Sequence, residues 1–239
     1  MKSTCQTVIQ ASNLRLLFAC GALAGPFFTL AWLVAGFARA NYNALLHPIS
    51  SLAIGESGWT QIANFLITGA LLLAFALGLK RALQLLNEPT RVPFLIATIG
   101  IGLLGAGIFL TDPMNGYPPG TPDLPVQYSL EGRLHRLFSA FVFLGLPIAC
   151  FMFARFFRRR GERIWTVYSR VSGIAFLLMF VVTTLAFAQL YNLAQFAGLL
   201  QRITLTIGFA WLTLLALYWL KVPFKAVRET GITEWAAQK

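Results

Sequence analysis

Segment 47–52, with the sequence HPISSL, combines a histidine with two hydroxyl groups. Pro48 suits the first turn of a helix, where its missing N–H costs nothing. Ser50 and Ser51 follow His47 by three and four residues, a spacing that places side chains over one face of a helix. The segment therefore predicts a short helix with His47 at its entrance and both serines near the imidazole.

The second histidine, His135, follows a loop rich in Pro and Gly that begins at Asp112. An unstructured connection of this length is uncommon unless it is functional or disordered. Two imidazoles and a carboxylate are a usual ligand set for a catalytic zinc, with water in the fourth position, and zinc makes that water a nucleophile. The sequence predicts one catalytic site, with zinc as its candidate cofactor. The catalytic candidates are His47, Ser50, Ser51, Asp112 and His135, and the candidate metal ligands are His47, Asp112 and His135.

Each of these residues also has a structural interpretation. His47 could cap a helix, Asp112 could cap an Asp-Pro turn, and His135 could bond a backbone carbonyl. The sequence has no closely spaced pair of histidines of the HExxH kind, so the spacing alone leaves the metal open. A shared site is favoured because both histidines and the carboxylate stand at ends of apolar runs, where ionisable groups are costly.

The elements that would position these residues are long apolar runs. The 239 residues are 57% hydrophobic and only 11% charged, whereas soluble domains carry about 25% charged residues. A membrane-spanning helix needs about 20 mostly apolar residues. The pattern predicts an all-α, polytopic membrane protein, a six-transmembrane-helix bundle in a single membrane domain over 1–239. We place the spans at about 16–38, 58–80, 93–111, 135–155, 169–189 and 203–220.

The distribution of charge predicts the orientation. Of the 19 basic residues, 15 lie in the N-terminal segment, the second and fourth connections and the C-terminal tail, and 4 lie on the other side. The positive-inside rule then predicts that both termini are cytoplasmic, in the cytoplasmic (inner) cell membrane, and that the histidines face outward. The net charge of +11 sits at helix ends, which favours contact with membrane lipids and argues against nucleic-acid binding. Protein partners are left open.

Small residues mark where helices approach one another. Gly21 and Gly25 form a GxxxG pair in the first span, and the third span contains Gly100, Gly102 and Gly105. Glycines let membrane helices pack closely, so we expect these to lie at contacts within the chain. No acidic or basic residue falls in the middle of a predicted span, which argues against a proton pump or a cation-coupled transporter.

Together these motifs resemble a known family. His47-Pro48 opens the second span, the third span is rich in glycine and ends at Asp112-Pro113, and His135 begins the fourth. This arrangement resembles the prokaryotic six-helix membrane proteins catalogued as domain of unknown function 998. The resemblance covers nearly the whole chain and implies a fold and a membrane location. It implies no activity.

A looser similarity is to membrane hydrolases of the alkaline ceramidase and adiponectin-receptor type, which use a serine, an aspartate and three histidines around zinc. Ser50 or Ser51, Asp112, His47 and His135 would take the matching parts. The last span contains no histidine, so zinc would lack one ligand unless Glu131 or water supplied it. The leading hypothesis is a lipid-active enzyme, a metal-assisted hydrolase. The alternative is a non-enzymatic accessory or binding protein, or a facilitator for a small apolar solute.

Overall fold

Six α-helices make up most of the described chain. The computed structural model describes residues 2–88, 91–125 and 127–223. Basic residues of the tail 224–239, which contributed to the predicted orientation, lie outside this part. The α-helices are α1 (Lys2–Ala38), α2 (Trp59–Leu85), α3 (Val92–Ile108), α4 (Leu130–Arg159), α5 (Arg163–Phe187) and α6 (Ala197–Leu220). Three short 3-10 helices lie in the connections, η1 (Ile49–Ala53), η2 (Glu56–Gly58) and η3 (Ala194–Phe196).

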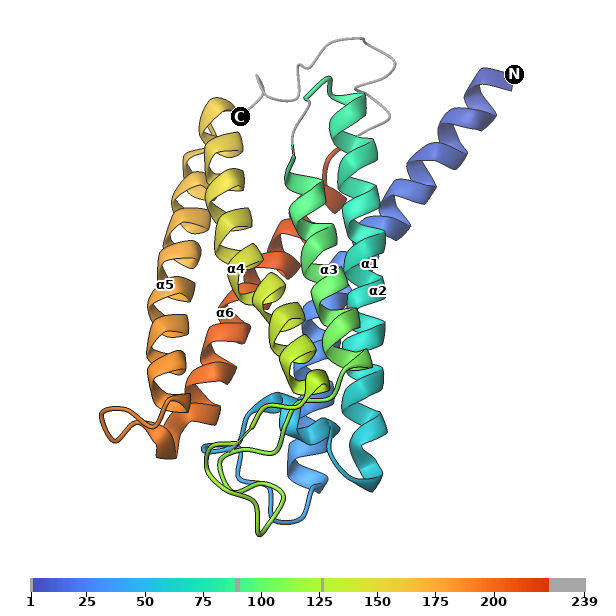
Figure 1. Cartoon of the computed structure of the whole chain (residues 1–239). Coiled ribbons are helices and arrows are strands. Elements are labelled where there is room, and N and C mark those ends of the chain that lie inside the picture. The colour runs from blue at the N-terminus through green and yellow to red at the C-terminus, as the bar shows by residue number, and fades with distance from the viewer. Residues whose placement is uncertain (1, 89–90, 126, 224–239) are drawn as a thin grey trace.

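The helices form a closed ring in chain order. Each packs against its neighbours in sequence, and α1 also packs against α6. Successive helices run in opposite directions, so the connections alternate between the two ends of the bundle (Figure 1). Segments 39–58, 109–125, 127–129 and 188–196 lie together at one end, which we call the long-loop end. The N-terminus and the connection between α4 and α5 lie at the opposite end.

Length and composition fit a membrane bundle. Among the described residues, five helical stretches are long and apolar enough to cross a membrane, within α1, η2–α2, α4, α5 and η3–α6. Helix α3 has 17 residues, a rise of about 26 Å at 1.5 Å per residue, which is the short limit for a spanning helix. The prediction of a multi-pass helical membrane protein is confirmed at this level.

The ends of the third and fourth spans differ from the predicted ones. Helix α3 stops at Ile108 instead of 111, and α4 starts at Leu130 instead of 135. Ser129 is the reason for the early start, because its hydroxyl accepts a hydrogen bond of 2.9 Å from the N–H of Gly132. Such a cap satisfies a backbone donor that the first turn leaves free. His135 therefore lies in the second turn of α4 and not at its first residue.

The glycines of α1 lie at helix contacts, as the sequence predicts. A Cβ on Gly21 would stand 2.5 Å from the ring of Phe75 on α2. A Cβ on Gly25 would stand 2.8 Å from the carbonyl oxygen of Phe209 on α6. These two positions let α1 approach both of its neighbours and so close the ring.

Candidate functional site at the long-loop end

The ring of His135 is held by the last turn of α3. Its Nδ1 lies 3.1 Å from the carbonyl oxygen of Ala106 and 2.9 Å from that of Phe109. These carbonyls are free because the final turn of a helix has no further N–H groups to bond them. A carbonyl can only accept a hydrogen bond, so we assign the proton to Nδ1. In the neutral ring Nε2 is then the basic atom.

His135 lines two neighbouring cavities. The larger, of about 240 Å³, is walled by the long loops and by α4, α5 and α6, and contains Asp112, Arg136, Ser50 and Ser139. The smaller, of about 40 Å³, lies among the buried apolar side chains and shares His135 and both serines. Ser139 is four residues after His135 and so lies on the same face of α4. Within the described residues, neither serine hydroxyl makes a hydrogen bond.

Asp112 lies against the first turn of α4. Its Oδ1 accepts a hydrogen bond of 3.3 Å from the N–H of Ser129. A Cβ on Gly132 would stand 1.8 Å from Oδ2 of Asp112, so only a glycine admits the carboxylate here. The partial positive charge of a helix N-terminus favours a carboxylate at this place. Oδ2 is buried and has no hydrogen-bond partner among the described residues, so an unpaired carboxylate oxygen belongs to a side chain that lines the cavity.

His47 lies apart from this cavity. Its Nδ1 accepts a hydrogen bond of 2.9 Å from the N–H of Asn43, and its ring packs against Tyr42 and Tyr117, with centroids 5.4 and 5.0 Å away. Burial lowers the pKa of His47, a hydrogen bond with the backbone of Asn115 raises it, and the charge of Arg202 lowers it further. The surroundings therefore favour a neutral imidazole.

The predicted short helix after His47 exists as η1, a 3-10 helix. Pro48 stands just before it in an extended conformation. Ser50 reaches the cavity, whereas Ser51 is buried, does not line it, and has no partner for its hydroxyl among the described residues. The chain after His47 is therefore an extended residue followed by a 3-10 helix, and not the α-helical turn that the sequence predicts.

The described residues bring Asp112, His135 and Ser50 to one cavity and leave His47 and Ser51 outside it. Within residues 2–88, 91–125 and 127–223, no group of three or more His, Cys, Asp or Glu side chains is arranged to hold a metal ion. The zinc ligand set of His47, Asp112 and His135 stays a prediction from sequence.

Sequence reasoning missed two side chains of α6, one that lines the cavities and one that holds the 39–58 connection. Gln201 lines both cavities, and its Oε1 accepts a hydrogen bond of 2.8 Å from the N–H of Ile49. Arg202 is only 6% exposed and donates to the carbonyl oxygens of Ala44 and His47. The sixth predicted span began one residue later, at 203. The signal that could have pointed to Arg202 was its position as a basic residue at the edge of an apolar run.

A protein-family model, described as "Protein of unknown function (DUF998)", matches residues 22–218. The chain belongs to this family. The DUF998 region extends from the middle of α1 to the end of α6, so it includes Asp112, His135, Gln201 and Arg202. No curated protein and no solved structure matches the chain significantly. Membership of DUF998 therefore assigns no activity, and the function must be argued from the cavity itself.

Proposed function

We propose that the chain is a multi-pass protein of the cell membrane that binds the polar part of a lipid at the long-loop end and hydrolyses it. The observation that supports this is the state of His135. Two backbone carbonyls hold its Nδ1–H, and the side chain lines a cavity with two hydroxyl groups that are free within the described residues. A base fixed by a third group, beside a candidate nucleophile, is the arrangement that activates a serine.

In this reaction Nε2 of His135 takes the proton of a serine hydroxyl as that oxygen attacks the carbonyl carbon of an acyl ester of the lipid. The ester C–O bond breaks, and His135 returns the proton to the departing alkoxide of the lipid. A water molecule that gives its proton to the same Nε2 then attacks the acyl-serine, which releases the fatty acid and restores the serine. The carbonyls of Ala106 and Phe109 fix the tautomer and the orientation of the ring, as the aspartate does in a Ser-His-Asp triad. Ser139 and Ser50 are the two candidate nucleophiles. The reaction is assigned to a serine and not to a metal-bound water because His47 lies outside the cavity.

The walls of the cavity favour a head group with two kinds of polar atom. Asp112 offers a free carboxylate oxygen, and Arg136 offers a guanidinium that stacks on Tyr128, with Cζ 3.3 Å from the ring centroid. Among the described residues, Asp112 and Arg136 do not form a salt bridge with each other. An ammonium or hydroxyl group would suit Asp112 and a phosphate would suit Arg136. The substrate class is a zwitterionic phospholipid.

The orientation follows from the charges. Among the described residues, most lysines and arginines belong to helix ends and connections opposite the long loops, and six of them lie from Arg155 to Arg170. Under the positive-inside rule this end is cytoplasmic, as are both termini. The long-loop cavity then faces the outside of the cell membrane.

A fluorophosphonate probe, which reacts covalently with activated serines, tests the proposal on purified protein in lipid nanodiscs. We expect labelling at Ser139 or Ser50, mapped by tandem mass spectrometry, and a loss of about 100-fold or more in His135→Ala. Ser57→Ala removes a hydroxyl at the same end but outside the cavity, and should leave labelling unchanged. Absence of labelling, together with no release of fatty acid or head group from a native lipid extract by folded protein, would refute the hydrolase.

One observation favours a second candidate, a non-enzymatic lipid-binding or accessory protein. Within the described chain, neither Ser50 nor Ser139 is hydrogen-bonded to His135, whose Nδ1 is occupied by Ala106 and Phe109. This candidate predicts that the protein retains a phospholipid with Asp112 and Arg136 intact, yet neither reacts with the probe nor turns the lipid over.

A further inference from the structure

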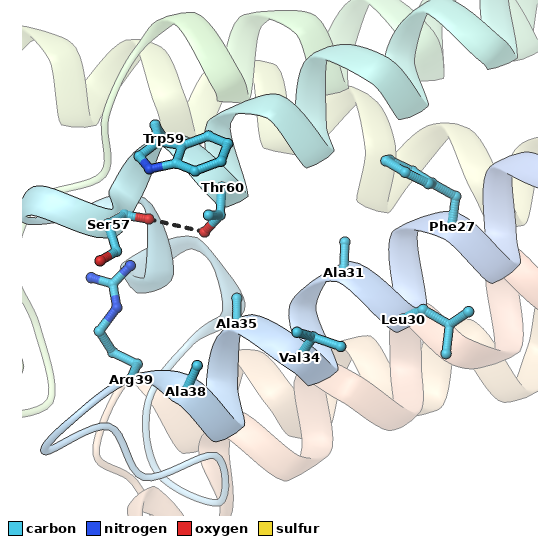
Figure 2. A pocket seen from close by; sticks show the side chains of 10 residues that line it. All are labelled: Phe27, Leu30, Ala31, Val34, Ala35, Ala38, Arg39, Ser57, Trp59 and Thr60. Atoms are coloured by element: carbon cyan, nitrogen blue, oxygen red, sulfur yellow. Dashed lines mark hydrogen bonds between the residues drawn. The ribbon is translucent and has the colours of Figure 1, made fainter.

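A separate groove runs along the outside of the ring between α1 and the start of α2. Its volume is about 570 Å³, and Figure 2 shows how the side chains of α1 form one wall along it. Leu30 and Val34, at its edge, are 61% and 67% exposed. Ala31, Ala35 and Ala38 are the small side chains of this wall. The α1 side of the groove is therefore a narrow apolar surface within the candidate membrane span Asn13–Ala38.

One end of the groove is polar. Arg39, Ser57, Trp59 and Thr60 close it at the long-loop end (Figure 2). The guanidinium of Arg39 donates to two backbone carbonyls, those of Ile54 at 2.7 Å and Leu52 at 3.0 Å. These carbonyls are neutral, and no carboxylate pairs with Arg39 within the described residues. A positive charge thus stands at the head of an apolar groove.

The length of the groove matches one leaflet of a bilayer. Its lining on this side runs from Phe27 to Arg39, which is about 18 Å along a helix at 1.5 Å per residue. The hydrocarbon core of one leaflet is about 15 Å thick, half of the roughly 30 Å of a bilayer. Trp59 is 69% exposed beside the polar end, in the position that interfacial tryptophans take at head-group level.

We propose that this groove is a binding site for one phospholipid of the leaflet at the long-loop end. The acyl chain lies along Ala31 and Ala35, and a phosphate oxygen binds the guanidinium of Arg39. A phosphate supplies the anion that Arg39 lacks among the described residues, and an acyl chain on the same molecule covers the apolar wall of α1. None of the residues that line the groove lines the His135 cavity, so the site is independent of the proposed hydrolase.

Native mass spectrometry of the full chain, released from detergent after incubation with phosphatidylglycerol, tests this site. We expect one retained phosphatidylglycerol per chain. Ala35→Trp fills the groove and should lower the retained fraction about tenfold, the effect of about 1.4 kcal/mol on binding. Ala38→Trp lies at an exposed position near the polar end and should also lower the retained fraction. It replaces Ala35→Trp in the experiment if that variant does not fold. Val181→Trp, 54% exposed on α5, is the control and should retain the lipid.

The contact between Arg39 and the phosphate is tested with a lipid that has no phosphate. A diacylglycerol with the same acyl chains should be retained about tenfold less than phosphatidylglycerol, and Arg39→Gln should remove this preference while Arg39→Lys keeps it. Equal retention of the two lipids, or of phosphatidylglycerol by Ala38→Trp and wild type, would overturn the proposal. So would a lipid-free dimer that becomes monomeric in Ala38→Trp, because a second copy would then cover the groove.

Discussion

Nη1 of Arg202 donates a hydrogen bond of 3.0 Å to the carbonyl oxygen of His47, a residue 155 positions earlier in the chain. The same nitrogen lies 2.6 Å from the carbonyl oxygen of Ala44, and Nη2 donates to the hydroxyl of Tyr42. The guanidinium also lies over the ring of Trp32, with Cζ 5.2 Å from the centroid. One buried cation thus joins the 39–58 connection to α6.

Replacing Arg202 with methionine should destabilise the protein strongly. The variant keeps an apolar stem but loses the charged donor to the carbonyl of Ala44 and one of the two donors to the carbonyl of His47, which keeps the hydroxyl of Tyr42. A hydrogen bond from a charged group contributes about 1.5–3 kcal/mol. We expect the free energy of unfolding in detergent to fall by about 2–5 kcal/mol in total. Arg133→Met, at an exposed position of α4, should change it by no more than about 0.5 kcal/mol. Equal effects of the two substitutions would show that the buried bonds of Arg202 contribute nothing to stability.

Gly132→Ala should lower probe labelling and lipid turnover while the fold is kept. The new Cβ would stand 1.8 Å from Oδ2 of Asp112, so the carboxylate must leave its place. An alanine within a helix is otherwise favourable by about 0.5–1 kcal/mol relative to glycine. We expect probe labelling and lipid turnover to fall about tenfold or more while helical content by circular dichroism is unchanged. Glu131→Ala is the neighbouring control, and unchanged activity in Gly132→Ala would exclude Asp112 from the site.

The protonation of His47 should make the connection 39–58 sensitive to acid. Burial lowers the pKa of folded His47 below its ordinary value of 6.5, so the unfolded chain binds the proton more readily. The stabilisation is complete above about pH 6.5 and is lost as pH falls through the folded pKa. His47→Asn keeps an acceptor for the N–H of Asn43 and cannot titrate. The difference in unfolding free energy between wild type and His47→Asn should therefore shrink between about pH 7.5 and about pH 5, and a constant difference would contradict this.

Closure of the ring should depend on Gly25. A Cβ there would stand 2.3 Å from Oγ1 of Thr213 and 2.8 Å from the carbonyl oxygen of Phe209. Gly25→Ala should push α1 from α6 and lower the free energy of unfolding by about 1–3 kcal/mol. Gly36→Ala is the matched control on the same helix, because its nearest neighbour, the ring of Tyr42, would be 3.4 Å away. Its effect should stay within about 0.5 kcal/mol, and a larger loss in Gly36→Ala than in Gly25→Ala would refute the packing argument.

Hydropathy was enough to find the helices, because each spanning helix satisfies its own backbone and needs only a continuous apolar run. It was less informative at helix ends, where single side chains decide. Ser129 caps α4, which starts five residues before the predicted position. Helix α3 ends at Ile108, where Nδ1–H of His135 donates to the carbonyl oxygens of Ala106 and Phe109. The prediction of intramolecular glycine contacts was confirmed at Gly21 and Gly25.

The candidate site was less accessible from sequence. Asp112 and His135 could be paired because both stand at the long-loop ends of neighbouring helices. His47 could not be separated from them, since its orientation depends on Asn43, Tyr117 and Arg202. Those contacts join segments up to 155 positions apart, and hydropathy says nothing about which helix lies beside which. The orientation of the termini and the zinc set stay predictions.

The contact between α1 and α6 has a consequence for biogenesis. Gln201 and Arg202 hold Ile49 and His47. Both belong to α6, which a ribosome delivers to the membrane after α1 to α5. A nascent chain with five inserted helices has no anchor for its first long loop and no α6 wall for its cavity. The candidate cavity is therefore complete only when translation has passed residue 202 and α6 has packed against α1.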